Sequence, residues 1–203
     1  MEWKGEKMKV YAYRHGAVAL PDEQKRFVGW TDYPLSKEGE QQILEAGRNA
    51  KFFPDFLFTS DLLRCRQSAA LFIQALQERR PAYKPALFLK EELREIHMGS
   101  WDGKTFQEIK EDFPEEFEKR GKNLASYRTP GGESFLDVQK RALSALEEIK
   151  KQTNGSSVVL FTHLGVLRTL RCHCLHTSCS HLMDWKLPYG TFVTMDLTHH
   201  TFS

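Results

Sequence analysis

The sequence predicts a three-layer α/β/α fold with a mainly parallel central sheet and a small helical insertion. Short β-rich runs alternate along the chain with longer runs of helical periodicity, a pattern typical of parallel strands joined by covering helices. A chain of 203 residues is long enough to bury one substantial core. Because we find no internal repeat and no low-complexity linker, we expect residues 1–203 to form one domain.

Apolar runs of strand length recur at intervals. The run at 156–162, SSVVLFT, predicts a buried strand. The run at 9–14, KVYAYR, alternates apolar and polar side chains and predicts the first strand. Weaker runs predict further strands at 55–60, directly after Pro54, at 86–93 and at 191–197.

The runs between these strands have helical periodicity. Ser36 is suited to cap the first helix, and Ser134 can form a capping box with Asp137 three residues later. Pro81 ends the second helical run. The sequence therefore predicts helices over 36–52, 61–80, 134–152 and 164–175.

The stretch from 99 to 121, GSWDGKTFQEIKEDFPEEFEKRG, differs from the rest in its density of charged residues. It predicts two short helices separated at Pro114, because proline cannot continue a helix. We expect residues 104–129 to form a helical lid or insertion beside the main layers.

Composition and charge exclude several kinds of partner. The formal net charge is +2, and acidic and basic residues are mixed along the chain, so neither a nucleic-acid footprint nor a membrane-binding face is indicated. No apolar run reaches the roughly 18 residues of a membrane helix. The charged start resembles no signal peptide, and we expect a cytoplasmic protein with a small-molecule substrate. The pattern makes no prediction of oligomeric state.

Residues 172–181, CHCLHTSCSH, gather three cysteines and three histidines. They could form a zinc site, but the spacing lacks the two C-x-x-C pairs of a zinc finger. The alternative is that the cysteines are buried free thiols, which pack like small apolar side chains. We favour the alternative and expect no metal.

Reactive side chains follow three of the predicted strands. In open α/β sheets, ligands bind beyond the carboxyl ends of the strands. Side chains from distant parts of the chain therefore meet at one edge of the sheet. These side chains are Arg14 and His15 after the first strand, Ser60 and Arg64 after the second, and Thr162 and His163 after the buried strand.

The grouping suits a phosphate ester. Two guanidinium groups match a phosphate dianion, and a neutral imidazole can accept a phosphoryl group. We expect the charge of Arg14 to keep His15 neutral, and the absence of a side chain at Gly16 to leave the approach open. The N-terminus of the helix after His163 would add backbone N–H donors.

Each of these residues also has a structural interpretation. Arg14 and His15 could belong to a surface turn, His163 could be a core histidine, and Arg64 could pair with Asp61. The coincidence of three strand ends favours the site.

Five ordered blocks carry a family resemblance across residues 9 to about 197. The chain resembles the histidine phosphatase superfamily, which has the phosphoglycerate mutase-like fold. The blocks are R-H-G at 14–16, T-S-D-L-L-R at 59–64, L-R-E-I-H-M-G-S-W-D-G at 93–103, P-G-G-E-S at 130–134 and F-T-H-L-G at 161–165.

The resemblance implies a role for each matching residue. His15 would be the nucleophile that becomes a phosphohistidine, and Arg14, Arg64 and His163 would bind the phosphoryl group. Glu95 would donate and accept the proton of the leaving group and of water. No cofactor is implied, because the arginines and His163 would supply the charge stabilisation.

Several residues near the expected substrate position differ from those that are frequent in the family. Residues 17–19 are Ala-Val-Ala, where many relatives have polar side chains, and Leu164 stands where glycine is frequent but keeps its backbone N–H. Phe27, Trp30 and Trp101 could line the mouth of the substrate pocket or belong to the core.

We expect a phosphatase rather than a mutase, because the region at 104–129 is compact and the chain ends soon after its last strand. The stretch at 25–32 and the P-G-G-E-S block are similar to α-ribazole phosphatases and to broad-specificity phosphatases. The expected activity is metal-independent hydrolysis of a small phosphorylated metabolite, with α-ribazole 5′-phosphate as first candidate. The alternatives are phosphoglycerate mutase activity and a non-catalytic phospholigand-binding protein.

Overall fold

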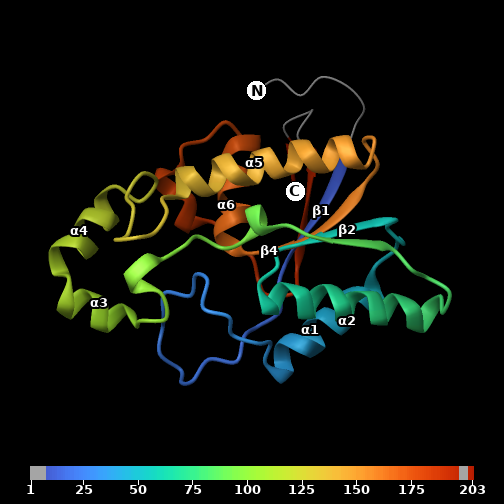
Figure 1. Ribbon diagram of the computed structural model, residues 1–203, viewed down its shortest axis with the longest axis horizontal. Coiled ribbons are helices and arrows are strands. Elements are labelled where there is room, and N and C mark those ends of the chain that lie inside the picture. The colour runs from blue at the N-terminus through green and yellow to red at the C-terminus, as the bar shows by residue number, and fades with distance from the viewer. Residues whose placement is uncertain (1–7, 197–200) are drawn as a thin grey trace.

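The computed structural model describes residues 8–196 and 201–203, which form a six-stranded mixed sheet with helices on both faces (Figure 1). The strands are β1 (Lys9–Arg14), β2 (Phe56–Thr59), β3 (Ala86–Leu89), β4 (Val158–Thr162), β5 (Phe192–Asp196) and β6 (Thr201–Phe202). The helices are α1 (Lys37–Asn49), α2 (Leu63–Arg79), α3 (Phe106–Asp112), α4 (Pro114–Lys122), α5 (Phe135–Gln152) and α6 (Leu164–Cys174).

The strand order β3-β2-β4-β1-β5-β6 places the three strands that carry the reactive side chains next to one another. β1 and β2 both pair in parallel with β4, with Arg14 opposite Thr162 and Thr59 opposite Phe161. Their carboxyl ends therefore lie at one edge of the sheet. β5 runs antiparallel to β1, but the central strands β1, β4 and β2 are parallel to one another. The prediction of a mainly parallel sheet is therefore confirmed.

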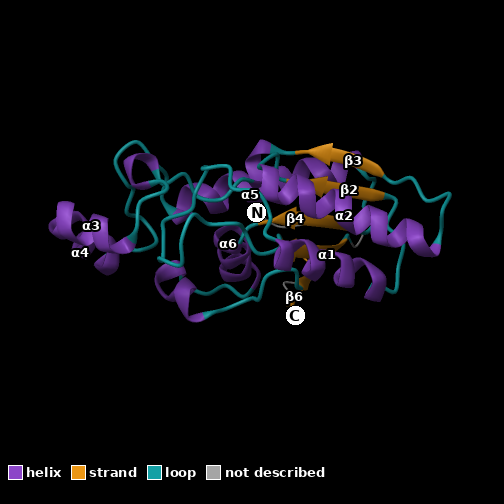
Figure 2. Ribbon diagram, turned by 90° about the horizontal axis from the view of Figure 1, so that it is seen from below, coloured by secondary structure: helices purple, strands orange, loops and turns teal. Residues whose placement is uncertain are grey.

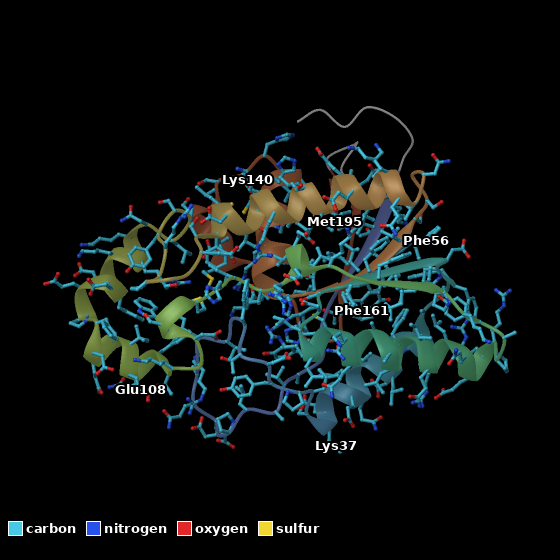
Figure 3. The ribbon with its side chains drawn as sticks, in the orientation of Figure 1. Lys37, Phe56, Glu108, Lys140, Phe161 and Met195 are labelled. Carbon is cyan, nitrogen blue, oxygen red and sulfur yellow. The ribbon has the colours of Figure 1, made fainter. Side chains whose placement is uncertain are left out.

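Helices α5 and α6 cover one face of the sheet, and α1 and α2 cover the other (Figures 1 and 2). The alternation of side chains along β1 serves both faces, because Val10 and Ala12 pack into one apolar cluster and Tyr13 into the other. Met195 and Phe161, both labelled in Figure 3, belong to the first and the second cluster respectively. The predicted three-layer architecture is confirmed.

The predicted helix starts are formed as the side chains suggest. Ser36 Oγ accepts a hydrogen bond from Gly39 N–H at 3.1 Å and caps α1. Ser134 and Asp137 form the reciprocal capping box of α5. Pro114 occupies the first turn of α4, directly after α3 has ended. In Figure 1, α3 and α4 lie apart from the sheet, at the far end of the molecule.

The predicted bounds are too long in several places. The strand predicted over 86–93 ends at Leu89, and a 3₁₀ turn follows at Glu91–Leu93. The reason is that β3 pairs with β2, which itself ends at Thr59, so residues beyond Lys90 have no strand to bond. The helix predicted over 36–52 ends with Asn49, and the helix predicted over 61–80 begins at Leu63.

The edge strand β6 was not predicted. It is two residues long and too short to leave a pattern in the sequence. Position 197, the last of the predicted strand over 191–197, lies outside the described residues. Among the described helices, none combines the length and apolar character needed to cross a bilayer.

Candidate active site

A cleft of about 490 Å³ opens beside the carboxyl ends of the central strands. Arg14, His15, Arg64 and Glu95 all line it. His163 does not line the cleft, but its ring centroid lies 5.1 Å from that of His15. The fold therefore brings together five side chains that the sequence places up to 149 positions apart, as the span from residue 14 to 163 shows.

His15 is buried and held in one tautomer. Its Nδ1 lies 2.7 Å from the backbone carbonyl oxygen of Gly16, which can only accept a hydrogen bond. The proton of the neutral ring is therefore on Nδ1, and Nε2 keeps its lone pair. Such a nitrogen is a competent nucleophile.

Burial keeps this ring neutral. It lowers the pKa of His15 well below the ordinary value, and the nearby charge of Arg64 is the next contribution. The Arg14 charge lowers this pKa as well, but its effect is smaller than the opposing hydrogen bond to Gly16. The sequence-based expectation named Arg14, whose charge does act in this direction, but burial and the Arg64 charge contribute more and could not be judged from the sequence.

Arg64 is almost fully buried, at 1% exposure, and donates three hydrogen bonds. Its Nε donates to Nδ1 of His163 at 3.2 Å, and its Nη atoms donate to the carbonyl oxygens of Thr31 and Gly29 at 3.1 and 2.7 Å. A guanidinium has five N–H donors, so two remain for a ligand. The alternative partner, Asp61, instead accepts a bond from Arg94 at 2.7 Å.

His163 has both ring nitrogens engaged within the protein. Because Arg64 can only donate, Nδ1 of His163 accepts, and the ring proton lies on Nε2, 3.0 Å from Ser60 Oγ. Burial, followed by the Arg64 charge, lowers the pKa of His163 well below the ordinary value. A bond from His163 to a phosphoryl oxygen would have to replace the bond to Ser60.

Arg14 rests on an aromatic ring that the sequence did not single out. Its Cζ lies 3.5 Å from the ring centroid of Tyr189, and Nη1 donates to the carbonyl oxygen of Leu187 at 2.6 Å. Tyr189 also lines the cleft, 5.5 Å from the ring of His15. The signal in the sequence was Pro-Tyr-Gly at 188–190, where a turn precedes the last predicted strand.

Glu95 is anchored at both carboxylate oxygens. Oε1 accepts the N–H of Ile96 at 2.9 Å, and Oε2 accepts the N–H of Gly165 at 3.1 Å. Of the neighbouring glutamates, Glu91 and Glu92 do not line the cleft. The choice of Glu95 as the candidate acid therefore agrees with the geometry.

One backbone N–H at the N-terminus of α6 is already bonded within the protein. The N–H of Gly165, in the first turn, bonds the carboxylate of Glu95 rather than being left for a phosphate. A Cβ atom at Gly165 would overlap Oε1 of Glu95, well under the 3.0 Å that real Cβ atoms keep. Glycine is thus required here for Glu95 to lie where it does. Leu164, the residue before it, lines the cleft as predicted.

Two other residues predicted to bind the substrate do not line the cleft. Gly16 does not line the cleft; a Cβ there would overlap the backbone of Gly39 in α1, so its lack of a side chain is a packing requirement. Trp30 does not line the cleft either, because its indole N–H is turned to the carbonyl oxygen of Glu95 at 2.8 Å. Trp101 is fully buried in the core, whereas Phe27 does line the cleft.

The cysteines of the 172–181 segment are buried free thiols. Burial raises the pKa of Cys174 and Cys179 to about 12. Among the described side chains, which do not include that of His181, no three of Cys, His, Asp or Glu are grouped closely enough to hold a metal ion.

Comparison with known proteins identifies the family. The profile of the Histidine phosphatase superfamily (branch 1) matches residues 10–203. The chain belongs to the histidine phosphatase superfamily.

Known histidine phosphatases and their relatives match nearly the whole chain. The 2,3-bisphosphoglycerate-dependent phosphoglycerate mutase of Chlamydia trachomatis serovar L2b (strain UCH-1/proctitis) is 28% identical over 213 residues, covering 94% of each chain. YhfR of Bacillus stearothermophilus is 31% identical with a TM-score of 0.80, over 97% of this chain and 94% of YhfR. The α-ribazole phosphatase from Shigella flexneri has the same fold, with a TM-score of 0.82 at 17% identity over 97% and 94%. The matched relatives thus include both phosphatases and mutases.

Within this member of the histidine phosphatase superfamily, the backbone of the candidate acid is clamped by Arg141 of α5. Nη1 of Arg141 donates to the carbonyl oxygens of Glu92 and Arg94, each at 2.7 Å, and Nη2 donates to that of Glu95 at 2.9 Å. The carboxylate of Glu133 accepts the other two bonds, at 2.8 and 2.9 Å. All five N–H donors are satisfied, which makes the clamp rigid. Glu133 is the glutamate of the P-G-G-E-S block at 130–134. The sequence showed this motif, but not that its glutamate holds Arg141 in place.

We expect Gly165→Ala to displace Glu95 and to impair catalysis without unfolding the protein. The loss in kcat/KM for a phosphomonoester with an alkyl leaving group should approach the roughly 10²–10⁴-fold contribution of a general acid. Gly121→Ala is the matched control, because no atom lies within 4 Å of a Cβ at that position. Equal activity of the two variants in steady-state assays would contradict this account of Gly165.

Stability should fall in mild acid. His15 and His163 have lowered pKa values in the folded protein but titrate near about 6.5 when unfolded. Below that pH the unfolded chain binds more protons, so acidification favours unfolding. We expect the free energy of unfolding in urea to decrease from about pH 7 to about pH 5, and to decrease less in His163→Gln. A slope as steep in the variant as in the wild type would refute the assignment.

Proposed function

We propose that the protein is a metal-independent phosphomonoester hydrolase that acts through a phosphohistidine on His15. The observation that carries the proposal is the bond from Nδ1 of His15 to the Gly16 carbonyl, which leaves a nucleophilic Nε2 in a ring that lines the cleft. Arg14 and Arg64 line the same cleft. Their charges supply the stabilisation that other phosphoryl-transfer enzymes draw from Mg²⁺.

In the first step, Nε2 of His15 attacks phosphorus and forms the P–N bond while the ester P–O bond breaks. Protonated Glu95 gives its proton to the departing oxygen, so an alcohol leaves rather than an alkoxide. The free N–H donors of Arg64 and the guanidinium of Arg14 bind the phosphoryl oxygens during transfer. The product of this step is phospho-His15, with Glu95 ionised.

In the second step, water attacks the phosphohistidine. The carboxylate of Glu95 takes a proton from the water as the new P–O bond forms and the P–N bond breaks. Phosphate is released, His15 returns to its neutral form, and Glu95 is again protonated. The clamp from Arg141 and the bond from Gly165 keep the carboxyl group in one place for both steps.

The proposed substrate is a small phosphorylated metabolite, with α-ribazole 5′-phosphate as first candidate. This choice is supported by the similarity of residues 25–32 and of the P-G-G-E-S block to α-ribazole phosphatases. A cytoplasmic location is part of the proposal, because all four cysteines are unpaired, as expected in a reducing compartment.

Phosphoglycerate mutase activity is the second candidate, favoured by the full-length match to the chlamydial mutase. That match covers 94% of both chains, so length does not separate the two activities, contrary to the sequence-based argument. A mutase must hold its product until phospho-His15 returns the phosphoryl group. The wall after Arg14-His15-Gly16 is apolar here, with Val18 and Leu20 lining the cleft, which favours release and hydrolysis.

The phosphohistidine is the decisive test. Acid-labile, base-stable label should appear on the protein after a rapid quench with ³²P-labelled substrate, and should be absent in His15→Ala. Phosphate release should match substrate loss, with no isomerised phosphoglycerate formed in a coupled assay. Isomerisation without phosphate release would establish the mutase, and tight binding with neither outcome would indicate a phospholigand-binding protein.

Glu95→Gln should separate substrates by leaving group. For alkyl phosphates kcat/KM should fall by roughly 10²–10⁴-fold, because the alkoxide leaves unprotonated. For 4-nitrophenyl phosphate the first step should be nearly unaffected, visible as a burst of nitrophenol that precedes slow turnover. An equal loss in the burst rate for both classes would mean that Glu95 is not the acid.

A further inference from the structure

The carboxylate of Asp102 accepts three backbone hydrogen bonds from one short segment, Gly29-Trp30-Thr31. Oδ1 accepts the N–H of Gly29 at 2.8 Å, and Oδ2 accepts the N–H groups of Trp30 and Thr31 at 2.7 and 2.9 Å. Because its acceptor is ionised, each of these bonds is stronger than a bond between neutral groups. Asp102 itself does not line the cleft. Its carboxylate therefore holds the 29–31 segment rather than a substrate.

The carbonyl oxygens of the 29–31 segment bond a side chain of the site. Arg64 donates to the oxygen of Gly29 at 2.7 Å and to that of Thr31 at 3.1 Å. An anion thus accepts the N–H groups of this segment, while a buried cation donates to two of its oxygens. The segment lies between two opposite charges that both stabilise its orientation.

The peptide group between Gly29 and Trp30 makes both contacts by itself. Its oxygen accepts from Arg64 and its N–H donates to Asp102, each at 2.7 Å. A trans peptide directs its C=O and N–H in opposite directions, so the two charged side chains lie on opposite sides of this group. Both charges polarise the peptide in the same direction, and each hydrogen bond therefore strengthens the other. Asp102 is coupled to Arg64 through the dipole of one peptide group.

The backbone around Asp102 fixes the position of the carboxylate. Asp102 follows the 3₁₀ turn at Gly99–Trp101, and its own N–H closes that turn. The next residue, Gly103, has a φ of +79°, a conformation that favours glycine, and donates its N–H to the carbonyl oxygen of Phe27 at 2.8 Å. This turn brings the carboxylate against the 29–31 segment.

We propose that Asp102 is a positioning residue for the phosphate site, which holds Arg64 in place through the Gly29–Trp30 peptide group. The inference rests on the proposed binding of a phosphate ester by Arg64. Without the carboxylate, the oxygens of Gly29 and Thr31 are no longer fixed, and the remaining N–H donors of Arg64 lose their direction toward the ligand. Because Arg64 also donates to Nδ1 of His163, its displacement disturbs that ring as well.

Asp102→Asn is the variant that tests this role. It conserves the shape of the side chain, but an amide has one acceptor oxygen and its NH₂ group cannot accept. At least one of the three N–H groups therefore loses its partner, whichever way the amide is turned. Should this variant fail to fold, Asp102→Glu, which moves the two oxygens outward by one methylene, takes its place in both measurements below.

Glu108→Gln is the matched control. Glu108, labelled in Figure 3, lies on α3, close in sequence to Asp102, and does not line the cleft. Its carboxylate also accepts a backbone N–H, that of Thr105, at 2.6 Å. The control therefore loses the same charge and the same kind of bond, but has no contact with the 29–31 segment.

The first measurement is the affinity for inorganic phosphate, determined by calorimetry without turnover. Asp102→Asn should weaken binding on the order of 10- to 100-fold, the range for a hydrogen bond to a charged group, and Glu108→Gln should stay within about twofold of wild type. In an Arg64→Gln background, Asp102→Asn should cause no further loss, because the group through which it acts is gone. An equal loss in both backgrounds, or no loss in either, would overturn the inference.

The second measurement follows the Nε–H of Arg64 by NMR in the free protein, and it remains decisive if Arg64→Gln does not fold. This N–H bonds His163 in the buried site and should exchange slowly with solvent in wild type and in Glu108→Gln. Asp102→Asn should accelerate the exchange on the order of 10-fold. Unchanged exchange would refute the role of Asp102 even if His15-dependent hydrolysis is found. Accelerated exchange in a protein without such hydrolysis would support that role and refute only the proposed function.

Discussion

The buried guanidinium of Arg64 is the interaction on which the rest of the site depends. A charge at 1% exposure is tolerated only when it is hydrogen-bonded, and here three of the five donors bond the 29–31 backbone and the ring of His163. Two segments distant in sequence are thereby tied to the start of α2. The same charge, added to burial, keeps His15 and His163 neutral. One arginine thus positions the site and maintains its nucleophile.

Glu95 depends on a second set of contacts that is separate from the first. It follows a 3₁₀ turn rather than a regular strand, so the sheet alone does not fix it. Its backbone is held by Arg141 and Trp30, and its carboxylate by the first turn of α6. These contacts come from elements on the α5 and α6 side of the sheet and from the loop before α1. The acid is therefore positioned by tertiary contacts, whereas His15 is positioned by the end of its own strand.

Local chemistry allowed much of this structure to be predicted. Ser36, Pro114 and the Ser134–Asp137 pair mark helix starts that short-range hydrogen bonds and sterics dictate. The overlong strand at 86–93 failed for a non-local reason, because the length of β2 limits its neighbour. The site residues Arg14, His15, Arg64 and Glu95 meet as the ordered motifs suggested. Trp30 and Gly16 do not line the cleft, because each satisfies a packing or hydrogen-bonding requirement of the protein itself.

The sequence by itself determined the order of strands and helices, the edge of the sheet at which reactive side chains collect, and the kind of chemistry they support. These follow from periodicity, capping and the identity of residues at strand ends, all of which are local. Only the tertiary structure decided which nitrogen of His15 is free, that burial sets its pKa, and that Arg141 clamps Glu95. Those features depend on distances between residues far apart in the chain, and no local pattern encodes them.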